Sequence, residues 1–230
     1  MSEARDIVLR ASNVAKAFRS PNGENLEVLR GLSMEIARGE SVSLRGESGA
    51  GKTTLMNVLA GLESPTRGEI FWDGRRVDGL SNSRQARLRS GFMGFVFQNY
   101  CLVPELDALE NVELAARICG NFGRAVRERA RGLLARVGLE GRMGHLPSQL
   151  SGGEKQRVAI ARAIVNSPRI ILADEPTGNL DESTAESVMD MLLSLCGHEG
   201  ASILLITHNP AFARMTSRAL CLEHGQITEV

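Results

Sequence analysis

The chain has 230 residues, of which 43% are apolar and 23% charged, and its 27 basic residues balance its 27 acidic residues. This length fits one large domain, or one domain that carries an inserted subdomain, with a core that needs no metal or disulfide. The composition argues against a membrane-spanning protein, a strongly basic nucleic-acid-binding protein, and a secreted or zinc-binding module built on paired cysteines. The N-terminus lacks the apolar stretch of a secretory signal, and the four cysteines are expected to be reduced, small and buried.

The first hundred residues are predicted to form mainly strands. Apolar residues that alternate with polar ones predict short strands at residues 7–9, 26–29, 32–36, 41–44, 68–72 and 94–97. Pro21-Asn22-Gly23 predicts a hairpin-type turn between two of these strands. Leu55, Met56, Leu59 and Leu62 recur at helical spacing, so a helix is expected over residues 53–62.

Helices dominate the next part of the chain. They are predicted at residues 110–118, 124–137, 151–166 and 183–195, with buried strands at 170–173 and 203–206. Five arginines of the second helix are expected to form a solvated surface opposite its apolar face, namely Arg124, Arg127, Arg129, Arg131 and Arg136. This order predicts an α/β fold in which a parallel sheet carries a nucleotide-binding loop and a helical subdomain is inserted.

One segment fits the phosphate-loop pattern G-x-x-x-x-G-K-[ST], and it runs Gly46-Glu47-Ser48-Gly49-Ala50-Gly51-Lys52-Thr53. Glycines allow such a loop to direct successive backbone N–H groups at phosphate oxygens, and the helix that follows offers its positive end. Lys52 is expected to place its ammonium on the β- and γ-phosphates, and Thr53 to offer a hydroxyl to Mg²⁺. The segment therefore predicts a nucleoside triphosphate site.

Two carboxylates follow a buried strand. Asp174 and Glu175 come directly after Ile170-Ile171-Leu172-Ala173, at the strand end where α/β sheets place their ligands. Asp174 is predicted to hold Mg²⁺, and Glu175 to polarise the attacking water.

A second helix start carries an anion-binding pattern. Leu150-Ser151-Gly152-Gly153-Glu154 combines an N-cap serine with two glycines that expose backbone N–H groups. The segment alone would be read as an ordinary N-cap.

Together these three motifs resemble the ATP-binding subunit of ABC transporters, and the resemblance covers nearly all of the chain. It implies a P-loop NTPase core with a mixed sheet and an antiparallel β-subdomain over residues 1–97 and 166–230, and an inserted α-helical signature subdomain over 98–165. The resemblance is closest to the lipoprotein-releasing, macrolide-export and cell-division ATPases. Two departures are Ala50, where Ser or Cys is usual, and Asn209, where Asp is common; activity is expected to persist.

The resemblance also implies roles for single residues. Glu175, His208 and Gln98 act in catalysis, and Thr53, Asp174 and Gln98 hold Mg²⁺. The D-loop is Asn179, Leu180 and Asp181, and the signature is Leu150, Ser151, Gly152, Gly153 and Glu154, which acts on ATP held by another subunit. ATP contacts Phe18, whose ring stacks on adenine, and the phosphate-loop residues Gly46, Glu47, Ser48, Gly49, Ala50, Gly51, Lys52, Thr53 and Thr54.

The family implies a homodimer that closes on ATP and Mg²⁺ and drives transmembrane permease subunits on a separate chain. The ATPase would lie at the cytoplasmic face of a bacterial inner membrane, peripheral through its partner, with no nucleic-acid partner. A non-transport ATPase that remodels the cell envelope, of the cell-division type, remains an alternative. A GTPase is disfavoured because no Asn-Lys-x-Asp segment occurs, a small-molecule kinase has no use for residues 150–154, and a chromosome ATPase needs long coiled-coil arms.

Overall fold

The computed structural model describes residues 6–19 and 25–230 of the chain. The chain forms two compact units, one within residues 1–89 and 204–230 and the other over residues 90–203. The helical subdomain predicted over residues 98–165 falls inside the second unit, and its boundaries stay a prediction. The turn predicted at Pro21-Asn22-Gly23 lies outside the described residues.

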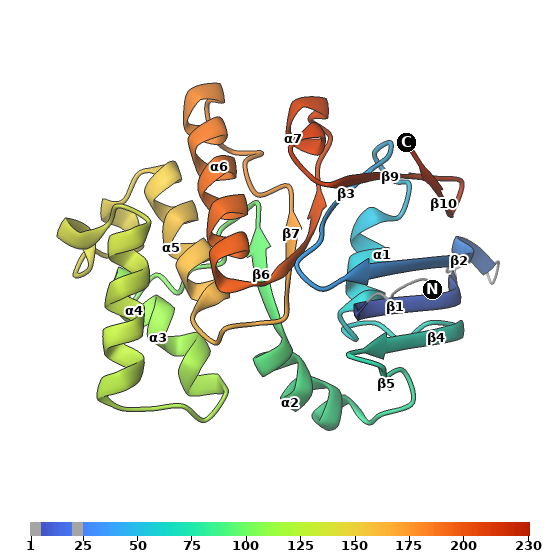
Figure 1. The fold of residues 1–230 in the computed structure, drawn as a ribbon, viewed down its shortest axis with the longest axis horizontal. Coiled ribbons are helices and arrows are strands. Elements are labelled where there is room, and N and C mark those ends of the chain that lie inside the picture. Colours follow the sequence, from blue (N-terminus) through green and yellow to red (C-terminus); the bar gives the residue numbers. More distant parts are fainter. Residues whose placement is uncertain (1–5, 20–24) are drawn as a thin grey trace. The chain divides into compact units, whose positions relative to one another are not determined.

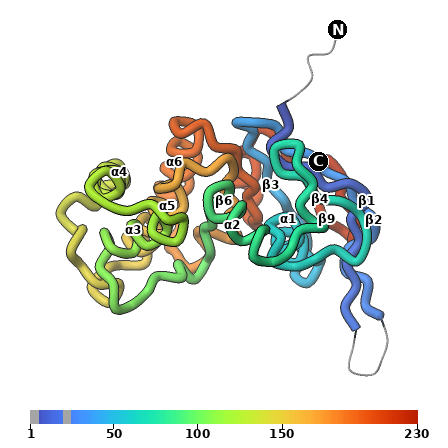
Figure 2. The backbone as a smooth tube through the Cα atoms, turned by 90° about the horizontal axis from the view of Figure 1, so that it is seen from below, coloured from blue at the N-terminus to red at the C-terminus, as the bar shows by residue number. Residues whose placement is uncertain are grey.

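An antiparallel sheet forms one part of the first unit (Figures 1 and 2). Its strands lie in the order β2-β1-β4-β5 and are β1 (Ile7–Arg19), β2 (Asn25–Ala37), β4 (Arg67–Trp72) and β5 (Arg75–Arg76). The strands predicted at 26–29 and 32–36 form the single strand β2. The register of β2 with β1 is irregular around Gly31, and the φ of +71° that glycine allows there lets the strand continue through the irregularity.

A second sheet of the first unit has the strand order β10-β9-β3-β8. Only residues 204–206 of β8 belong to the first unit. The strands are β3 (Ser41–Arg45), β8 (Ser202–Ile206), β9 (Arg218–Glu223) and β10 (Gln226–Glu229), and β3 runs parallel to β9. Helix α1 (Lys52–Leu59) follows β3 through the glycine-rich loop, and α7 (Pro210–Arg214) follows β8. Leu44, Leu55 and Leu59 are fully buried, so the strand before the loop and the helix after it are both anchored in the core.

The second unit contains the parallel pair β6 (Met93–Phe97) and β7 (Ile170–Asp174). Its helices are α3 (Ala108–Ile118), α4 (Arg124–Arg136), α5 (Gly152–Ile164) and α6 (Glu182–Glu199), with single 3₁₀ turns η1 (Glu140–Arg142) and η2 (Pro147–Gln149), and α2 (Asn82–Phe92) spans the boundary between the units. Helix α5 packs against β6, where a Cβ on Gly94 would lie 2.2 Å from the carbonyl oxygen of Ala163. The register places Phe97 opposite Asp174, so both strands end at the same edge.

The predicted α/β fold with a mixed and an antiparallel sheet is confirmed. The sequence patterns missed α2, α7, β5, β9 and β10. Helix α2 buries only Gln85, and therefore shows no apolar face. The elements α7, β5 and β10 have at most five residues each, and β9, although as long as β4, carries an apolar run rather than an alternation.

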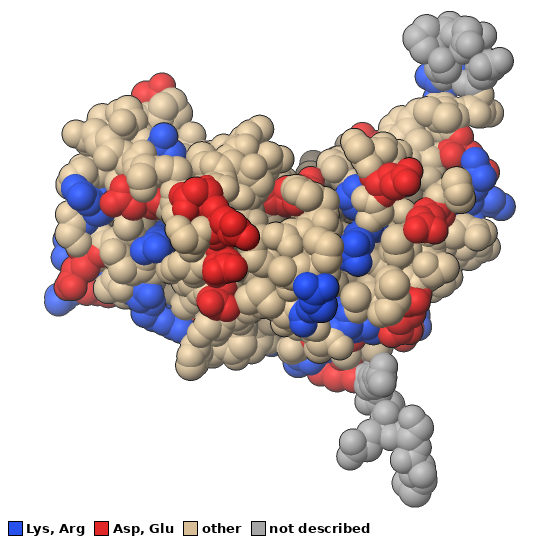
Figure 3. Space-filling model, turned by 90° about the horizontal axis from the view of Figure 1, so that it is seen from above, with Lys and Arg blue, Asp and Glu red and all other residues tan. Residues whose placement is uncertain are grey.

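Two expectations about side chains need correction. Only Cys196 is buried, while Cys119 and Cys221 are half-buried and Cys101 is exposed on a left-handed turn. Of the five arginines of α4, Arg124, Arg127, Arg131 and Arg136 are exposed as predicted, and only Arg129 is half-buried, where it pairs with Glu199 at 2.7 Å. Basic side chains lie scattered among acidic and uncharged ones on the face shown in Figure 3. No helix of the described part is long and apolar enough to cross a membrane.

Candidate functional site

The phosphate loop joins β3 to α1 in the first unit, and its glycines are required by its shape. Gly46 has a φ of +149°, and a Cβ there would lie 2.4 Å from the carbonyl oxygen of Leu222. Gly51 is the N-cap of α1 with a φ of +101°, and a Cβ there would meet Val28 at 2.7 Å. Any other residue at these two positions would strain the loop and push it away from its neighbouring strands.

Lys52 lies at the first helical position and folds back over the loop. Its Nζ donates hydrogen bonds of 2.8 Å to the carbonyl oxygens of both Gly46 and Glu47. The ammonium is therefore held above the loop, beside the positive end of α1, where an anion would be attracted. Thr53 is exposed in the same first turn, and Thr54 is half-buried.

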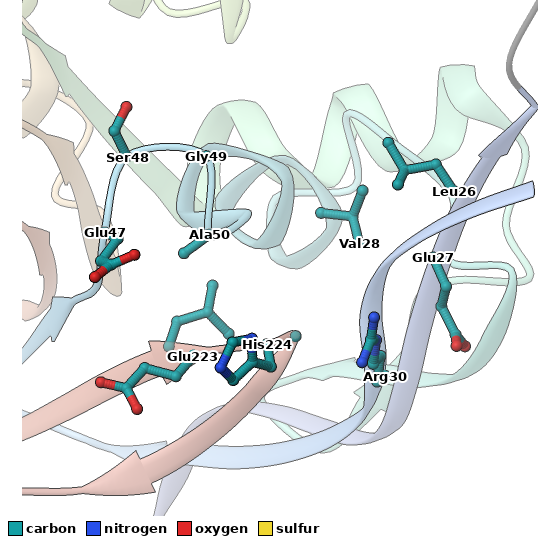
Figure 4. A pocket seen from close by; sticks show the side chains of 12 residues that line it. Leu26, Glu27, Val28, Arg30, Glu47, Ser48, Gly49, Ala50, Glu223 and His224 are labelled. Carbon is teal, nitrogen blue, oxygen red and sulfur yellow. The ribbon is translucent and has the colours of Figure 1, made fainter.

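A cavity of about 520 Å³ opens beside this loop (Figure 4). Residues 47–50 of the loop line one side, and Leu26, Val28 and Arg30 of β2 line another. The turn between β9 and β10, with His224 at its tip, completes the wall. In Figure 4 Ser48 points away from the cavity, while Ala50 points toward the turn. These β2 and turn residues were not found from the sequence, because only the fold brings them to the loop.

Phe18 lies near the end of β1, opposite Leu26 of β2, and 38% of its surface is exposed. It does not line the cavity itself, but its neighbour Leu26 does. The Nζ of Lys16 lies 4.8 Å from the centre of the ring and pairs with Glu63 at 2.9 Å. The ammonium of Lys16 therefore makes a cation–π contact with the Phe18 ring, and part of the ring remains exposed to solvent.

His208 is exposed at the end of β8, next to the fully buried strand residues. Asn209 follows as the N-cap of α7, and its Oδ1 accepts a hydrogen bond of 2.8 Å from the backbone N–H of Ala211. Asn and Asp cap helices about equally well, so the departure from the family pattern at this position keeps the local structure.

In the second unit, Asp174 and Glu175 emerge at the end of β7, as the sequence predicts. Glu175 has a φ of +45°, a conformation that is uncommon for a residue other than glycine. Its carbonyl oxygen accepts a hydrogen bond of 3.0 Å from Gly178, which closes the turn into the D-loop. Strained backbone of this kind is frequent at catalytic positions.

Gln98 and the D-loop residue Asn179 are hydrogen-bonded to each other. The Nε2 of Gln98 donates to the Oδ1 of Asn179 at 3.0 Å, and the Nδ2 of Asn179 donates to the backbone oxygen of Gln98 at 3.0 Å and to Asn99 at 3.2 Å. Asp181, at the end of the D-loop, is the N-cap of α6, and the hydrogen bonds from Thr184 and Ser183 lower its pKa to about 2. The D-loop is therefore fixed at both ends.

The signature residues form the start of α5 with a reciprocal capping box. The backbone N–H of Glu154 donates to the Oγ of Ser151 at 3.2 Å, and the backbone N–H of Ser151 donates to the Glu154 carboxylate at 2.8 Å. The second hydrogen bond lowers the pKa of Glu154, and Arg142 pairs with the same carboxylate at 3.3 Å. The box uses the Ser151 hydroxyl as an acceptor, which leaves its proton available to a further acceptor.

The predicted site residues thus fall into two groups. The first unit holds Phe18, the phosphate loop with Thr53 and Thr54, and His208. The second unit brings together Gln98, Asp174, Glu175 and the D-loop at the ends of two paired strands, and it holds the signature residues Leu150 to Glu154 at the start of α5. How the two groups meet around one nucleotide stays a prediction.

Comparisons with known proteins agree with this arrangement. A family model described as "ABC transporter" matches residues 29–178. A protein of Hydrogenovibrio crunogenus named "Lipoprotein-releasing system ATP-binding protein LolD" is 44% identical, over 96% of this chain and 95% of its own length. A LolD protein of Paramagnetospirillum magneticum is 46% identical, over 96% and 98%. The "Uncharacterized ABC transporter ATP-binding protein YbbA" of Escherichia coli is 44% identical, over 89% and 90%.

Among solved structures, the ATP-binding cassette MJ0796 is similar, in a dimeric, post-hydrolysis state bound to ADP and Pi. The TM-score is 0.88 at 38% sequence identity, and the match covers 96% of this chain and 97% of that one. The resemblance inferred from the motifs is therefore confirmed by the family match, by relatives that align along nearly the whole chain, and by a shared fold. The chain belongs to the ABC transporter family, as an ATP-binding subunit.

Proposed function

We propose that the chain binds ATP in its phosphate loop, closes on a second copy of itself, and uses hydrolysis to drive a membrane protein on another chain. The observation that carries this proposal is the loop at the start of α1, in which Lys52 is poised over the carbonyls of Gly46 and Glu47. A bound triphosphate would compete for this ammonium, since charge-assisted bonds to phosphate are stronger than bonds to neutral carbonyls.

The cavity beside the loop fits the rest of the nucleotide. Leu26 and Val28 offer apolar surface for the base, and the backbone amides of the loop would bind the phosphates. Phe18, in register with Leu26, adds an exposed aromatic ring at the end of the same strand pair. We assign adenine to this ring and the adjoining apolar wall.

We therefore expect Phe18→Ala to weaken ATP binding roughly tenfold, because stacking of a base on an aromatic ring contributes about 1–3 kcal/mol. Maximal turnover should change little, since the ring lies away from the γ-phosphate. Titration with a fluorescent ATP analogue measures the affinity, and Phe122→Ala, which removes another exposed aromatic ring, is the matched control. An unchanged affinity in the Phe18 variant would remove the adenine assignment.

Hydrolysis is assigned to groups of both units. Glu175 accepts the proton of the attacking water, while His208 donates a hydrogen bond to the γ-phosphate. Gln98 is held by Asn179, so its amide has a fixed place at the edge where β6 and β7 end. Ser151 and the glycines after it bind the γ-phosphate of the neighbouring copy through the hydroxyl and the first amides of α5.

The residues present fit Mg²⁺ as the metal. Thr53, Asp174 and Gln98 would hold the ion, and their hydroxyl, carboxylate and amide oxygens are the hard ligands that Mg²⁺ prefers. Within residues 6–19 and 25–230, no three His, Cys, Asp or Glu side chains form a metal-binding cluster. Mg²⁺ at nucleotide sites commonly takes its other ligands from phosphate and water. When bound, the ion neutralises charge on the β- and γ-phosphates.

We infer lipoprotein release as the work that this ATPase drives, because relatives that align along nearly the whole chain are named as lipoprotein-releasing ATP-binding proteins. The chain would act at the cytoplasmic face of the bacterial inner membrane, peripheral through its partner. We propose that residues 102–106, which follow Gln98 shortly after the end of β6, contact that partner.

The test is purification of the tagged full-length chain from detergent-solubilised membranes, followed by reconstitution of the complex in vesicles that carry a lipoprotein. We expect a multi-span membrane protein to copurify, and Mg²⁺-ATP to release lipoprotein from the vesicles, with EDTA abolishing both hydrolysis and release. A complex that hydrolyses ATP but leaves the lipoprotein in the vesicles would favour envelope remodelling instead. A chain that hydrolyses no ATP in any complex would contradict the proposal as a whole.

A further inference from the structure

The chain makes two consecutive tight turns directly after β6. The backbone N–H of Tyr100 donates to the carbonyl of Phe97 at 3.2 Å, so Gln98 and Asn99 occupy the middle of the first turn. The N–H of Cys101 then donates to the carbonyl of Asn99 at 2.5 Å, which makes Tyr100 the centre of a γ-turn.

Both residues at the second turn are held in a left-handed conformation. The φ angles are +58° at Tyr100 and +49° at Cys101, and neither residue is of the type that adopts this conformation readily. A γ-turn with positive φ is itself rare and strained. Such a backbone persists only where surrounding contacts hold it in place.

Arg162 of α5 supplies those contacts. Its guanidinium donates to the carbonyl oxygen of Tyr100 at 2.7 Å and to the carbonyl oxygen of Cys101. The side chain is half-buried, and this burial lowers the pKa of the Arg162 guanidinium. Two carbonyls of successive residues match the planar fork of arginine, and the single ammonium of a lysine would not span them in the same way.

The same helix begins at the signature residues and packs on β6, so Arg162 connects two functional segments (Figure 1). Tyr100 also approaches the start of that helix, since a Cβ on Gly152 would lie 3.0 Å from its hydroxyl. On the other side of the turn, Gln98 is held by Asn179. The position of Gln98 is thus set by a side-chain partner and by a backbone turn that Arg162 clamps.

We propose that Arg162 is a positioning residue for ATP hydrolysis, which clamps the left-handed turn at Tyr100 and Cys101 to α5 and thereby holds Gln98 in its working place. The inference rests on the proposed function, because it assigns Gln98 to the hydrolytic site. Arg162 has no assigned contact with ATP, so its removal should lower the rate of hydrolysis while ATP affinity is kept.

The experiment compares the full-length chain with its Arg162→Met variant by steady-state kinetics and by hydrogen–deuterium exchange. We expect kcat to fall about tenfold with KM for ATP within about twofold, because Lys52 and Phe18, the groups assigned to ATP binding, are unchanged. Exchange of the peptide that contains residues 98–102 should rise about tenfold, while the peptides of α1 stay protected. Arg162→Lys should give an intermediate kcat, because one of the two carbonyls keeps a donor.

A glycine substitution supplies the rescue. Cys101→Gly removes the cost of the left-handed conformation at one of the two residues, so the double variant Arg162→Met/Cys101→Gly should turn over about threefold faster than Arg162→Met alone. Cys101→Gly alone should stay within about twofold of the unsubstituted chain. Absence of any rescue would show that Arg162 does not act through this turn, and would overturn the inference.

Arg129 offers a matched control for loss of an arginine from this unit. It also donates to two successive main-chain carbonyls, those of Ile164 and Val165, at the C-terminal end of α5. Arg129→Met should leave kcat and the exchange of residues 98–102 unchanged. An equal fall of kcat in both arginine variants, or unchanged exchange at 98–102 in Arg162→Met, would contradict the proposal. If the unsubstituted chain hydrolyses no ATP, the proposed function fails, while the exchange data still decide whether Arg162 holds the turn.

Discussion

Glu175→Gln should reduce ATP hydrolysis by about 10²–10⁴-fold, the usual effect of removing a general base, and leave ATP binding close to normal. The amide keeps the size of the side chain but cannot accept the proton of the attacking water. The φ of +45° at Glu175 sets the direction in which its side chain leaves the backbone. A neighbouring carboxylate would leave the chain in another direction, so we do not expect it to take over the role of the base. Phosphate release and nucleotide titration, measured on the same preparation, separate the two quantities.

The control for the Glu175 variant is Glu186→Gln, on an exposed position of α6 in the same unit. It removes the same charge and should leave the rate unchanged. Hydrolysis at a near-normal rate by Glu175→Gln would show that another group accepts the proton, and the catalytic assignment would then be wrong.

Lys52→Ala should weaken ATP binding by roughly 10- to 100-fold, since a hydrogen bond from a charged donor contributes about 1.5–3 kcal/mol. Turnover should be lost as well, because the same ammonium stabilises the γ-phosphate as its charge develops. The loop itself should also loosen, since Lys52 bridges the carbonyls of Gly46 and Glu47. Isothermal titration with ATP and Mg²⁺ measures the loss of affinity.

Lys52→Arg tests whether charge alone is sufficient. Its planar guanidinium is larger and cannot occupy the narrow place of the ammonium between two loop carbonyls, so we expect activity to remain low. Lys155→Ala removes a lysine outside the loop and should keep ATP affinity. Full binding by Lys52→Ala would contradict the assignment of the phosphate site.

Local motifs explain why much of the site could be predicted from sequence. The phosphate loop is one contiguous segment whose glycines are demanded by its own backbone, as at Gly51. The capping box at Ser151 and Glu154 links residues three apart. Asp174 and Glu175 follow a run of buried residues, so the strand end was visible as well. In each case the interacting groups are neighbours along the chain.

Contacts between distant segments could not be predicted in this way. The wall of the cavity combines β2, the phosphate loop and the turn at His224. The pairing of β3 with β9 brings the loop to this turn, and the hydrogen bond of 2.8 Å from the N–H of Arg30 to the carbonyl of Gly225 joins β2 to it. The hydrogen bonds from Arg162 to the carbonyls of Tyr100 and Cys101 join segments about 60 residues apart. A periodic pattern of apolar residues cannot predict that an arginine side chain binds backbone carbonyls. The exposure of Cys101 was missed for the same reason, because it follows from the left-handed turn.

The central claim is that the phosphate loop of one copy and the signature residues of another form a single site. Two inactive variants test it when they are mixed. Lys52→Ala disables the loop, and Ser151→Asp keeps a good N-cap for α5 while it places a negative charge where the γ-phosphate must bind.

The decisive measurement is ATP hydrolysis by an equimolar mixture of Lys52→Ala and Ser151→Asp chains. Each mixed dimer would contain one site with an intact Lys52 and an intact Ser151, so we expect recovery of up to about a quarter of normal activity if the sites act independently and the chains pair at random. Each variant alone should stay inactive at the same total concentration. A mixture that remains as inactive as its components, although sedimentation shows that mixed dimers form with ATP, would contradict the claim that the site is shared between two copies.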